Sequence, residues 1–407
     1  MRLQETKEKN NIEKVIIFII SISCILLQYI AAVFTYGFIL LLIMMIYMCV
    51  KNKKIYIDKD FAVLITVLTI QQIVTAIVGN RITEANIKFI IMMWLIFFTM
   101  SLGYYVNDKK ILYKYLKVIG VSATVIVFIQ YIMINFFDMR VGPIMFIKQP
   151  QEYLKNWALS GLRPTGFFSE PQVFCSCILP LIIMALINRE YNLVVFFSIG
   201  IVLTGSSLGI MMLLGIATIV LFLSNLNYKK KIAFFLLFVV LILLFLNLEI
   251  FESARNKIFT IFNDFALYSN EKMTNNHSYT NYLRLLKGWV TYIELPTKDK
   301  ILGIGVYNFP EYLQHTNVIF SWNSIWSNNA VMAKYFTSAA GTFIECGFFG
   351  AMAYIVFLCK KYYHGNSVNR IIIILIAIQS FVTQIFFNNI FIFYFLIYYA
   401  LMERSEK

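Results

Sequence analysis

The amino-acid sequence predicts an all-α polytopic membrane protein with about 12 transmembrane helices and a large extracytoplasmic loop between helices 9 and 10. Of its 407 residues, 60% are hydrophobic and 14% are charged, whereas a soluble chain carries charge on roughly a quarter of its residues. The mean hydropathy of +0.73 points the same way. The apolar residues also form long runs, so lipid is the expected solvent for most of the chain.

The apolar runs give the expected spans in chain order. The first run, from Val15, has no small-residue cleavage site and leads almost at once into the second, so we expect it to stay as a membrane anchor. Three neighbouring pairs, within 15–50, 191–225 and 370–402, are short enough to form interrupted hairpins. The expected spans are residues 15–33, 35–50, 61–79, 87–106, 116–137, 171–188, 191–204, 207–225, 232–250, 341–359, 370–386 and 388–402.

The distribution of charge supports this topology. With the N-terminus in the cytoplasm, the cytoplasmic segments carry 21 of the 35 Lys and Arg residues and the outer segments carry 14. This excess obeys the positive-inside rule, so we expect both termini in the cytoplasm and the chain in the cytoplasmic membrane of the cell. The net charge of +14 does not indicate nucleic acid, because the basic residues lie in short clusters and form no continuous basic face.

The expected organisation has three parts. Residues 1–250 carry helices 1 to 9 and an outer loop at about 137–170, residues 251–340 form the large extracytoplasmic loop, and residues 341–407 carry helices 10 to 12 and a cytoplasmic C-terminus. A connection as long as 251–340 is usually functional or disordered. This one contains many aromatic residues, so we expect it to fold.

Several chemistries are absent from the sequence. No G-x-x-x-x-G-K-[ST] or H-E-x-x-H motif occurs, and the six cysteines have no metal-ligand or disulfide spacing. We therefore predict no cofactor and no metal site, and we interpret the cysteines as small packing residues. The stretch Asp58-Lys59-Asp60 resembles the D-x-D of sugar-nucleotide enzymes, but it falls in a short turn, so we interpret it as a solvated linker.

The first candidate site is the outer stretch G-L-R-P-T-G-F-F-S-E-P, residues 161–171, which leads directly into a span. Pro171 suits a first helical turn, and Ser169 or Glu170 can cap the exposed amides. A helix N-terminus attracts anions, and Arg163 could add a bidentate contact to phosphate. The alternative is an ordinary capped helix with a surface arginine.

The second candidate site lies in the large loop. Residues 281–289, N-Y-L-R-L-L-K-G-W, indicate an amphipathic helix on which Arg284 and Lys287 share a face. Such a helix could instead lie on the membrane and place its basic residues at lipid headgroups. Residues 300–309, K-I-L-G-I-G-V-Y-N-F, follow, with two glycines that allow tight turns.

A third candidate is the stretch A-G-T-F-I-E-C-G-F-F-G, residues 340–350, at the start of the tenth span. Glu345 lies near the expected membrane edge, where an acid is costly unless it is paired or functional. A structural partner for Arg163 or Arg284 and a catalytic role are both open interpretations of Glu345.

The order of these stretches resembles the family of O-antigen and capsular polysaccharide polymerases (Wzy-type) and O-antigen ligases. The resemblance covers nearly the whole chain by architecture and roughly 150 residues by motif: an Arg before G-F-F-S-E-P, then Y-L-R-L-L-K-G-W with I-L-G-I-G-V-Y-N-F, then F-I-E-C-G-F-F-G. It implies a membrane-embedded, metal-independent glycosyltransferase. The expected reaction transfers a growing glycan from undecaprenyl diphosphate onto a lipid-linked oligosaccharide repeat unit at the outer face of the membrane.

The resemblance also implies roles for residues. Arg163 and Arg284, with Lys287 beside them, would bind diphosphate, where fixed guanidinium groups stabilise the charge that develops on the leaving group. Glu170 and His315 are the candidate catalytic residues for the acceptor hydroxyl, and Glu345 is a supporting residue. The expected partners are the lipid-linked oligosaccharide, the lipid bilayer and a separate protein that regulates chain length.

Two alternatives remain open. Ligases of this family carry a His shortly before the helix that follows the large loop, whereas this chain has Y-F-T-S at 335–338, which favours a polymerase. A flippase for lipid-linked oligosaccharides is the rival from another class. Transporters usually place charged residues within their spans, and the expected spans here are nearly free of charge.

Overall fold

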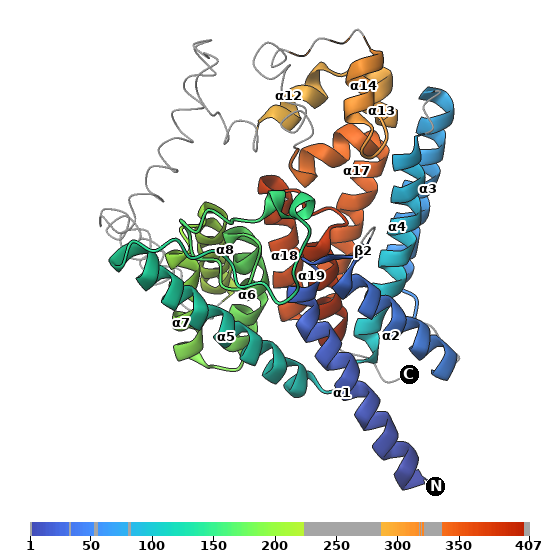
Figure 1. Cartoon of the computed structure of the whole chain (residues 1–407). Helices are drawn as coiled ribbons and strands as arrows, with labels where there is room; N and C mark the ends of the chain where they lie inside the picture. The colour runs from blue at the N-terminus through green and yellow to red at the C-terminus, as the bar shows by residue number, and fades with distance from the viewer. Residues whose placement is uncertain are drawn as a thin grey trace.

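The computed structural model describes residues 2–31, 34–52, 56–79, 83–223, 286–316, 318, 320 and 336–402. These residues are mostly helical (Figure 1). Their one sheet is a short antiparallel pair, β1 (Ile30–Ala31) and β2 (Phe34–Thr35). The helices are α1 (Arg2–Leu26), α2 (Tyr36–Asn52), α3 (Lys59–Gly79), α4 (Glu84–Met100), η1 (Ser101–Tyr105), α5 (Lys109–Phe136), η2 (Gln151–Asn156), α6 (Pro171–Ile187), α7 (Tyr191–Leu203), α8 (Ser207–Leu223), α12 (Lys287–Glu294), α13 (Thr297–Leu302), α14 (Phe309–His315), α17 (Ser338–His364), α18 (Ser367–Val382) and α19 (Asn389–Leu401).

Each expected span that the structure describes contains a helix, but α1 ends at Leu26 and residues 30–31 of the first expected span form β1. The expected ninth span at 232–250 lies outside the described residues. Within the described part, 4 helices are long and apolar enough to cross a membrane: Lys59–Gly79, Glu84–Tyr105, Lys109–Phe136 and Ser338–His364. Several shorter apolar helices accompany them. These helices suit a membrane protein, whereas the predicted count of about 12 spans is not established by them.

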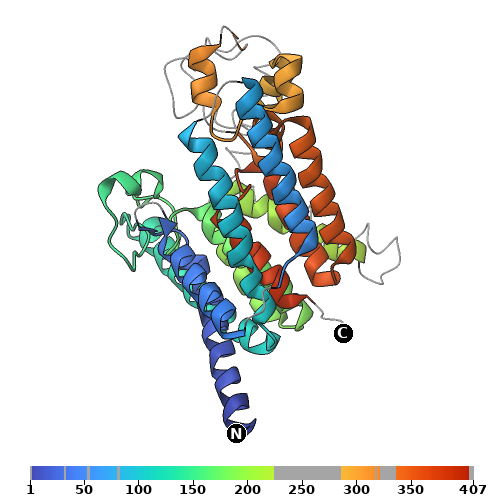
Figure 2. The same ribbon diagram turned by 90° about the vertical axis from the view of Figure 1, so that its right-hand side faces the viewer.

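The described parts of the expected large loop form α12, α13 and α14. Figures 1 and 2 both place these three short helices at one end of the bundle, near the ends of α3, α4 and α17. We call this end, marked by residues 287–315, the loop end. The opposite end, where α1 begins and α17 and α19 finish, is the terminus end.

The core of the bundle lies around α18 and α19. Helix α19 is apolar on every face and is buried from Phe391 to Leu401, as expected of a helix surrounded by other helices. Helix α18 packs against both α17 and α8, so it joins the α3–α4–α17 group to the α6–α7–α8 group. The loop end of α17 is thereby fixed to the centre of the molecule.

An ion cluster at the terminus end corrects the interpretation of Asp58-Lys59-Asp60 as a solvated linker. The Lys361 ammonium lies 2.7 Å from the Asp58 carboxylate and 3.0 Å from the Asp60 carboxylate. Tyr399 donates its hydroxyl to Asp58 at 2.6 Å, and Asp58 also accepts the Phe61 N–H at the start of α3. Asp58 and Lys361 are 6% and 5% exposed, so the cluster holds α3 to α17 and α19 from inside the bundle.

Candidate functional site

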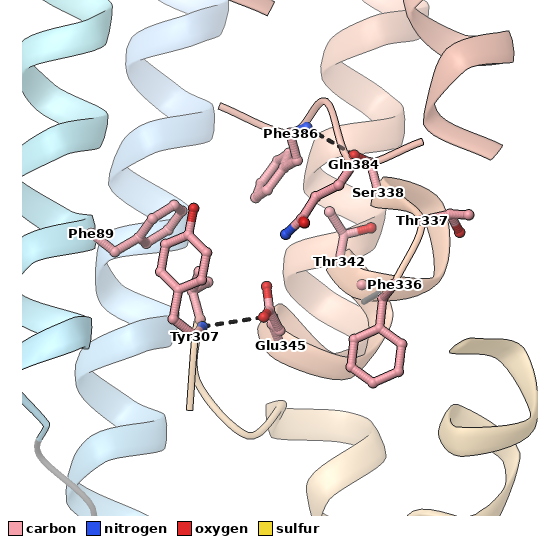
Figure 3. Close-up of a pocket in the computed structure, with 11 residues that line it drawn as sticks. Phe89, Tyr307, Phe336, Thr337, Ser338, Thr342, Glu345, Gln384 and Phe386 are labelled. Atoms are coloured by element: carbon pink, nitrogen blue, oxygen red, sulfur yellow. Dashed lines mark hydrogen bonds between the residues drawn. The ribbon is translucent and has the colours of Figure 1, made fainter. Parts of the chain in front are cut away.

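A pocket at the loop end combines a carboxylate with hydroxyl groups, an amide and aromatic rings (Figure 3). The empty space in and around it is about 340 Å³, which includes space open to solvent. Its walls come from α4, from the residues between α13 and α14, from the first turns of α17 and from the segment after α18. The lining residues are Phe89, Val306, Tyr307, Phe336, Thr337, Ser338, Gly341, Thr342, Glu345, Gln384 and Phe386.

The first turn of α17 forms one wall of this pocket. Thr337 caps the helix by accepting the Ala340 N–H, as a threonine at an N-cap commonly does. Ser338 then joins the helix to the segment after α18, because its hydroxyl oxygen accepts the N–H groups of Ile385 at 2.5 Å and Phe386 at 2.8 Å. These bonds hold the start of α17 next to the segment that carries Phe386 of the pocket lining.

Glu345 provides the carboxylate of the pocket. Its side chain is half-buried, and its Oε1 atom accepts the backbone N–H of Tyr307 at 3.2 Å (Figure 3). Helix α17 breaks two residues later at Gly347, whose φ of 64° lies in the left-handed region that favours glycine. The break leaves backbone carbonyls of the preceding turn available to a second segment of chain.

That second segment is residues 303–308, which we call the glycine loop. Two of its backbone N–H groups bind the carbonyls next to the break: Ile304 donates to Ile344 at 3.0 Å, and Gly305 donates to Glu345 at 3.0 Å. Gly303 has a φ of 77°, and a side chain there would overlap the backbone around Gly347. Two of the stretches singled out in the sequence, 300–309 and 340–350, are therefore docked together at one site.

Arg163 lies outside the pocket lining and holds the end of α7. Its guanidinium donates to the Thr204 carbonyl at 3.2 and 3.3 Å and to the Gly205 carbonyl at 2.7 Å. A cation is favourable there because the carbonyl end of a helix carries partial negative charge. The predicted convergence of Arg163 with Arg284 on a diphosphate stays a prediction, because Arg284 lies outside the described residues.

Glu170 occupies the N-cap position of α6, but its side chain makes no capping hydrogen bond, so the expected capping role is wrong for this residue. Pro171 does occupy the first turn, as predicted. The segment before it is held by Gln130 of α5, which accepts the N–H groups of Thr165 at 3.0 Å and Gly166 at 2.7 Å. The lining of the Glu345 pocket does not include Glu170.

Lys287 begins α12 and is fully buried, at 0% exposure. Its ammonium nitrogen lies 5.0 Å from the centre of the ring of Phe336, a residue that also lines the pocket. Burial lowers the pKa of Lys287 to about 7, because the charged form loses hydration. A helix does form in this stretch, although the described part of it begins at Lys287 and not near 281.

His315 is the last residue of α14, and its side chain is 65% exposed. Its Nε2 atom lies 4.0 Å from the Glu311 carboxylate on the same helix. The lining of the Glu345 pocket does not include His315. Among the described residues, no group of three or more His, Cys, Asp or Glu side chains could hold a metal ion.

Polar amides inside the apolar runs are the functional feature that the sequence interpretation missed. Gln71, Gln72 and Asn86 are buried on α3 and α4. Gln72 and Asn86 contact the glycine loop, and Gln71 binds the Leu302 carbonyl just before it. An amide is costly in an apolar environment unless its groups are hydrogen-bonded, so side chains of this kind within a span are a usable signal.

The pocket suits a ligand rich in hydroxyl groups. Its carboxylate can accept a proton, its hydroxyl and amide groups can hydrogen-bond, and its rings offer flat apolar faces. Neither a protein-family model nor a curated protein sequence matches the chain.

Proposed function

We propose that this chain is a membrane-embedded polysaccharide polymerase that transfers a growing glycan from undecaprenyl diphosphate onto a lipid-linked oligosaccharide repeat unit. Glu345 acts as the general base. The observation that carries the proposal is the pocket at the loop end, in which a carboxylate held by a backbone N–H faces hydroxyl groups and aromatic rings. The order of sequence motifs that resembles the polymerase family adds the lipid-linked substrates.

The chemistry of the step assigns one task to Glu345. An acceptor hydroxyl loses its proton to the carboxylate while its oxygen forms a bond to the anomeric carbon of the donor glycan. The bond from that carbon to the diphosphate oxygen breaks, and the diphosphate leaves with the electron pair. General-base assistance of this kind contributes about 10²- to 10⁴-fold in rate.

The composition of the lining supports the acceptor sugar as its occupant. No Lys or Arg is among the residues that line the pocket in the described part of the chain, so a diphosphate would find no cation there. A sugar ring could instead lie against Phe89, Phe386 or Tyr307, with its hydroxyl groups toward Thr342 and Gln384. The donor diphosphate is assigned to the site predicted at Arg163 and Arg284.

Glu345 takes the role for which Glu170 and His315 are the sequence-based candidates. Glu345 is half-buried in a pocket and its carboxylate is held by the Tyr307 N–H. His315 has a largely exposed side chain on α14, and Glu170 lies at the start of α6. A base needs to lie within hydrogen-bonding reach of the hydroxyl proton, which a pocket residue can achieve for a bound sugar.

The test uses purified full-length protein in liposomes with a lipid-linked repeat unit, and measures polymer length against time. Glu345→Gln keeps the acceptor for the Tyr307 N–H but takes up no proton, so we expect a loss of about 10²- to 10⁴-fold in rate. His315→Gln and Glu170→Gln serve as matched controls and should polymerise at close to the unchanged rate.

Two outcomes would overturn the proposal. Polymerisation by Glu345→Gln at the unchanged rate removes the carboxylate from the reaction. Movement of unextended lipid across the bilayer, with no lengthening by the unchanged chain, supports the flippase instead. Addition of a chelator should leave the rate unchanged, because the proposed transfer uses no metal ion.

A further inference from the structure

Gln72 is a fully buried amide in the middle of α3, at 0% exposure. A primary amide in an apolar interior costs about 1–3 kcal/mol unless its oxygen and nitrogen are hydrogen-bonded. The oxygen and the nitrogen of the Gln72 side-chain amide both have hydrogen-bond partners. The oxygen binds the glycine loop and Asn86, and the nitrogen binds the neighbouring Gln71.

The oxygen of Gln72 binds the glycine loop. Its Oε1 atom accepts the backbone N–H of Val306 at 2.9 Å and the side-chain amide N–H of Asn86 at 3.1 Å. Its Nε2 atom donates to the side-chain oxygen of Gln71 at 2.6 Å. Gln71 and Thr75 in turn both donate to the Leu302 carbonyl, just before the loop.

The far side of the glycine loop is held by the same group of amides. Asn308 donates its side-chain N–H to Asn86 at 2.6 Å, and its side-chain oxygen accepts the Thr83 hydroxyl at 2.5 Å. Helices α3 and α4 therefore hold the loop at its start, middle and end. None of these amide side chains lines the pocket itself.

The four successive N–H groups of residues 304–307 all have an acceptor. The first two bind the carbonyls of Ile344 and Glu345, the third binds Gln72, and the fourth binds the Glu345 carboxylate. The third and fourth N–H groups lie in two successive planar peptide groups that share the Cα atom of Val306. A shift of the Val306 amide therefore displaces this shared atom, and the Tyr307 amide is displaced with it.

We propose that Gln72 is a positioning residue for Glu345, acting through the backbone of Val306, which links the amide bound by Gln72 to the Tyr307 amide bound by Glu345. This inference rests on the proposed role of Glu345 as the base. Without the Gln72 oxygen, the buried N–H groups of Val306 and Asn86 lose their acceptor, and the loop relaxes to regain one. The Tyr307 N–H then moves away from the Glu345 carboxylate, while the lining residues of α4, of α17 and of the segment after α18 stay in place to bind the acceptor sugar.

The kinetic experiment compares three variants of the full chain in liposomes. Gln72→Met has a similar length and lacks the acceptor, so we expect kcat to fall roughly 10- to 100-fold with KM within about twofold, as for a misplacement near 1 Å. Gln72→Glu restores the acceptor oxygen and should recover most of that loss. Gln379→Met is the matched control, because Gln379 is also fully buried but binds Ser176 and Tyr394, far in sequence from the glycine loop.

A second measurement does not depend on activity. Hydrogen–deuterium exchange should become faster in a peptide that contains residues 303–308 of Gln72→Met, and stay unchanged there in Gln379→Met. Equal kcat and equal exchange in the two Met variants would overturn the inference, as would a Gln72→Glu variant no faster than Gln72→Met.

The outcomes separate this inference from the proposed function. If the unchanged chain makes no polymer but Gln72→Met still loosens residues 303–308, the glycine loop is held as described and the polymerase proposal fails. If Glu345→Gln is inactive and Gln72→Met is as active as the unchanged chain, Glu345 keeps its role and the positioning by Gln72 is wrong.

Discussion

Lys287 brings an amine into the apolar contact between α12 and the start of α17. Its pKa falls to about 7 in the folded chain from a usual value near 10.5, because burial disfavours the charged form. Between about pH 7 and 10.5 the unfolded chain therefore binds more protons at this residue than the folded chain does. The contribution of Lys287 to the free energy of unfolding should therefore rise with pH across that window and be constant below it.

Lys287→Met tests this behaviour. Methionine has a similar length and does not titrate, so the proton uptake of the unfolded chain at this position is removed. We therefore expect the dependence of Tm on pH between 7 and 10 to flatten. Thermal unfolding in detergent at several pH values provides the measurement, with Lys298→Met, at the rim of a different pocket, as the control. A dependence of Tm on pH as steep as that of the unchanged chain would contradict the prediction.

The sequence identified Glu345, the glycine loop and the start of α6, because each breaks an apolar pattern with charged, glycine or proline residues. It did not identify the contacts that they make. Arg163 binds carbonyls 41 and 42 positions further along the chain, and Val306 binds an amide 234 positions earlier. Such long-range hydrogen bonds depend on how the helices pack, which local periodicity does not determine.

Most helices could be placed from the sequence, since an apolar run long enough to cross lipid has to satisfy its backbone as a helix. The ends of the helices were less predictable. Helix α1 begins at Arg2, well before the apolar run, and α4 changes to a 3₁₀ turn at Ser101. The break at Gly347 was also missed, because a single glycine inside an apolar run is as easily interpreted as close helix packing.

Gly347→Ala tests the break in α17. An added Cβ would overlap backbone atoms of Ile301 and Gly303, and the left-handed φ of 64° is strained for alanine. We expect a loss of at least about 2 kcal/mol in stability, together with displacement of the glycine loop. Differential scanning fluorimetry of the detergent-solubilised chain measures the loss.

Gly341→Ala is the matched control on the same helix. Its added Cβ would lie 3.6 Å from the nearest side-chain atom, an ordinary van der Waals contact. Because alanine has the higher helix propensity, we expect a small gain of about 0.5–1 kcal/mol. Similar Tm values for the two alanine variants would show that the loop does not dock tightly at Gly347.

At the scale of the whole molecule, α17 connects the two polar centres. Glu345 lies near its loop end and Lys361 lies 16 residues later, near its terminus end. The ion cluster of Asp58, Asp60 and Lys361 fixes one end of this helix, and the glycine loop fixes the other. Stability and the proposed catalysis should therefore respond to different substitutions.

Asp58→Asn tests that separation. It leaves a buried ammonium with a weaker partner, so we expect a loss of about 3 kcal/mol in stability, while kcat per folded molecule stays close to the unchanged value. Asp60→Asn should have the smaller effect, because the Asp60 side chain is 23% exposed against 4% for Asp58. If the free energy of unfolding of Asp58→Asn is no lower than that of Asp60→Asn, the buried part of the cluster does not hold the bundle.

The predicted orientation in the membrane is tested by introduced cysteines. His315→Cys lies at the loop end and His364→Cys at the terminus end, and both histidines have side chains that are more than half exposed. A maleimide that does not cross membranes should label the first in intact cells and the second after permeabilisation. The unchanged chain, with Cys359 exposed, supplies the background. Labelling of His364→Cys in intact cells, with His315→Cys labelled only after permeabilisation, would show the opposite orientation in the membrane.

The docking of residues 304–307 on α17 has a consequence for how this protein can vary. Each of the four successive amides meets its own acceptor, so one added or deleted residue would leave every later amide facing the wrong atom. The spacing from Gly303 to Asn308 should consequently be constant among any homologous chains, whatever the lengths of the surrounding connections. A library of single-residue insertions along 287–315 would show this as a short intolerant stretch.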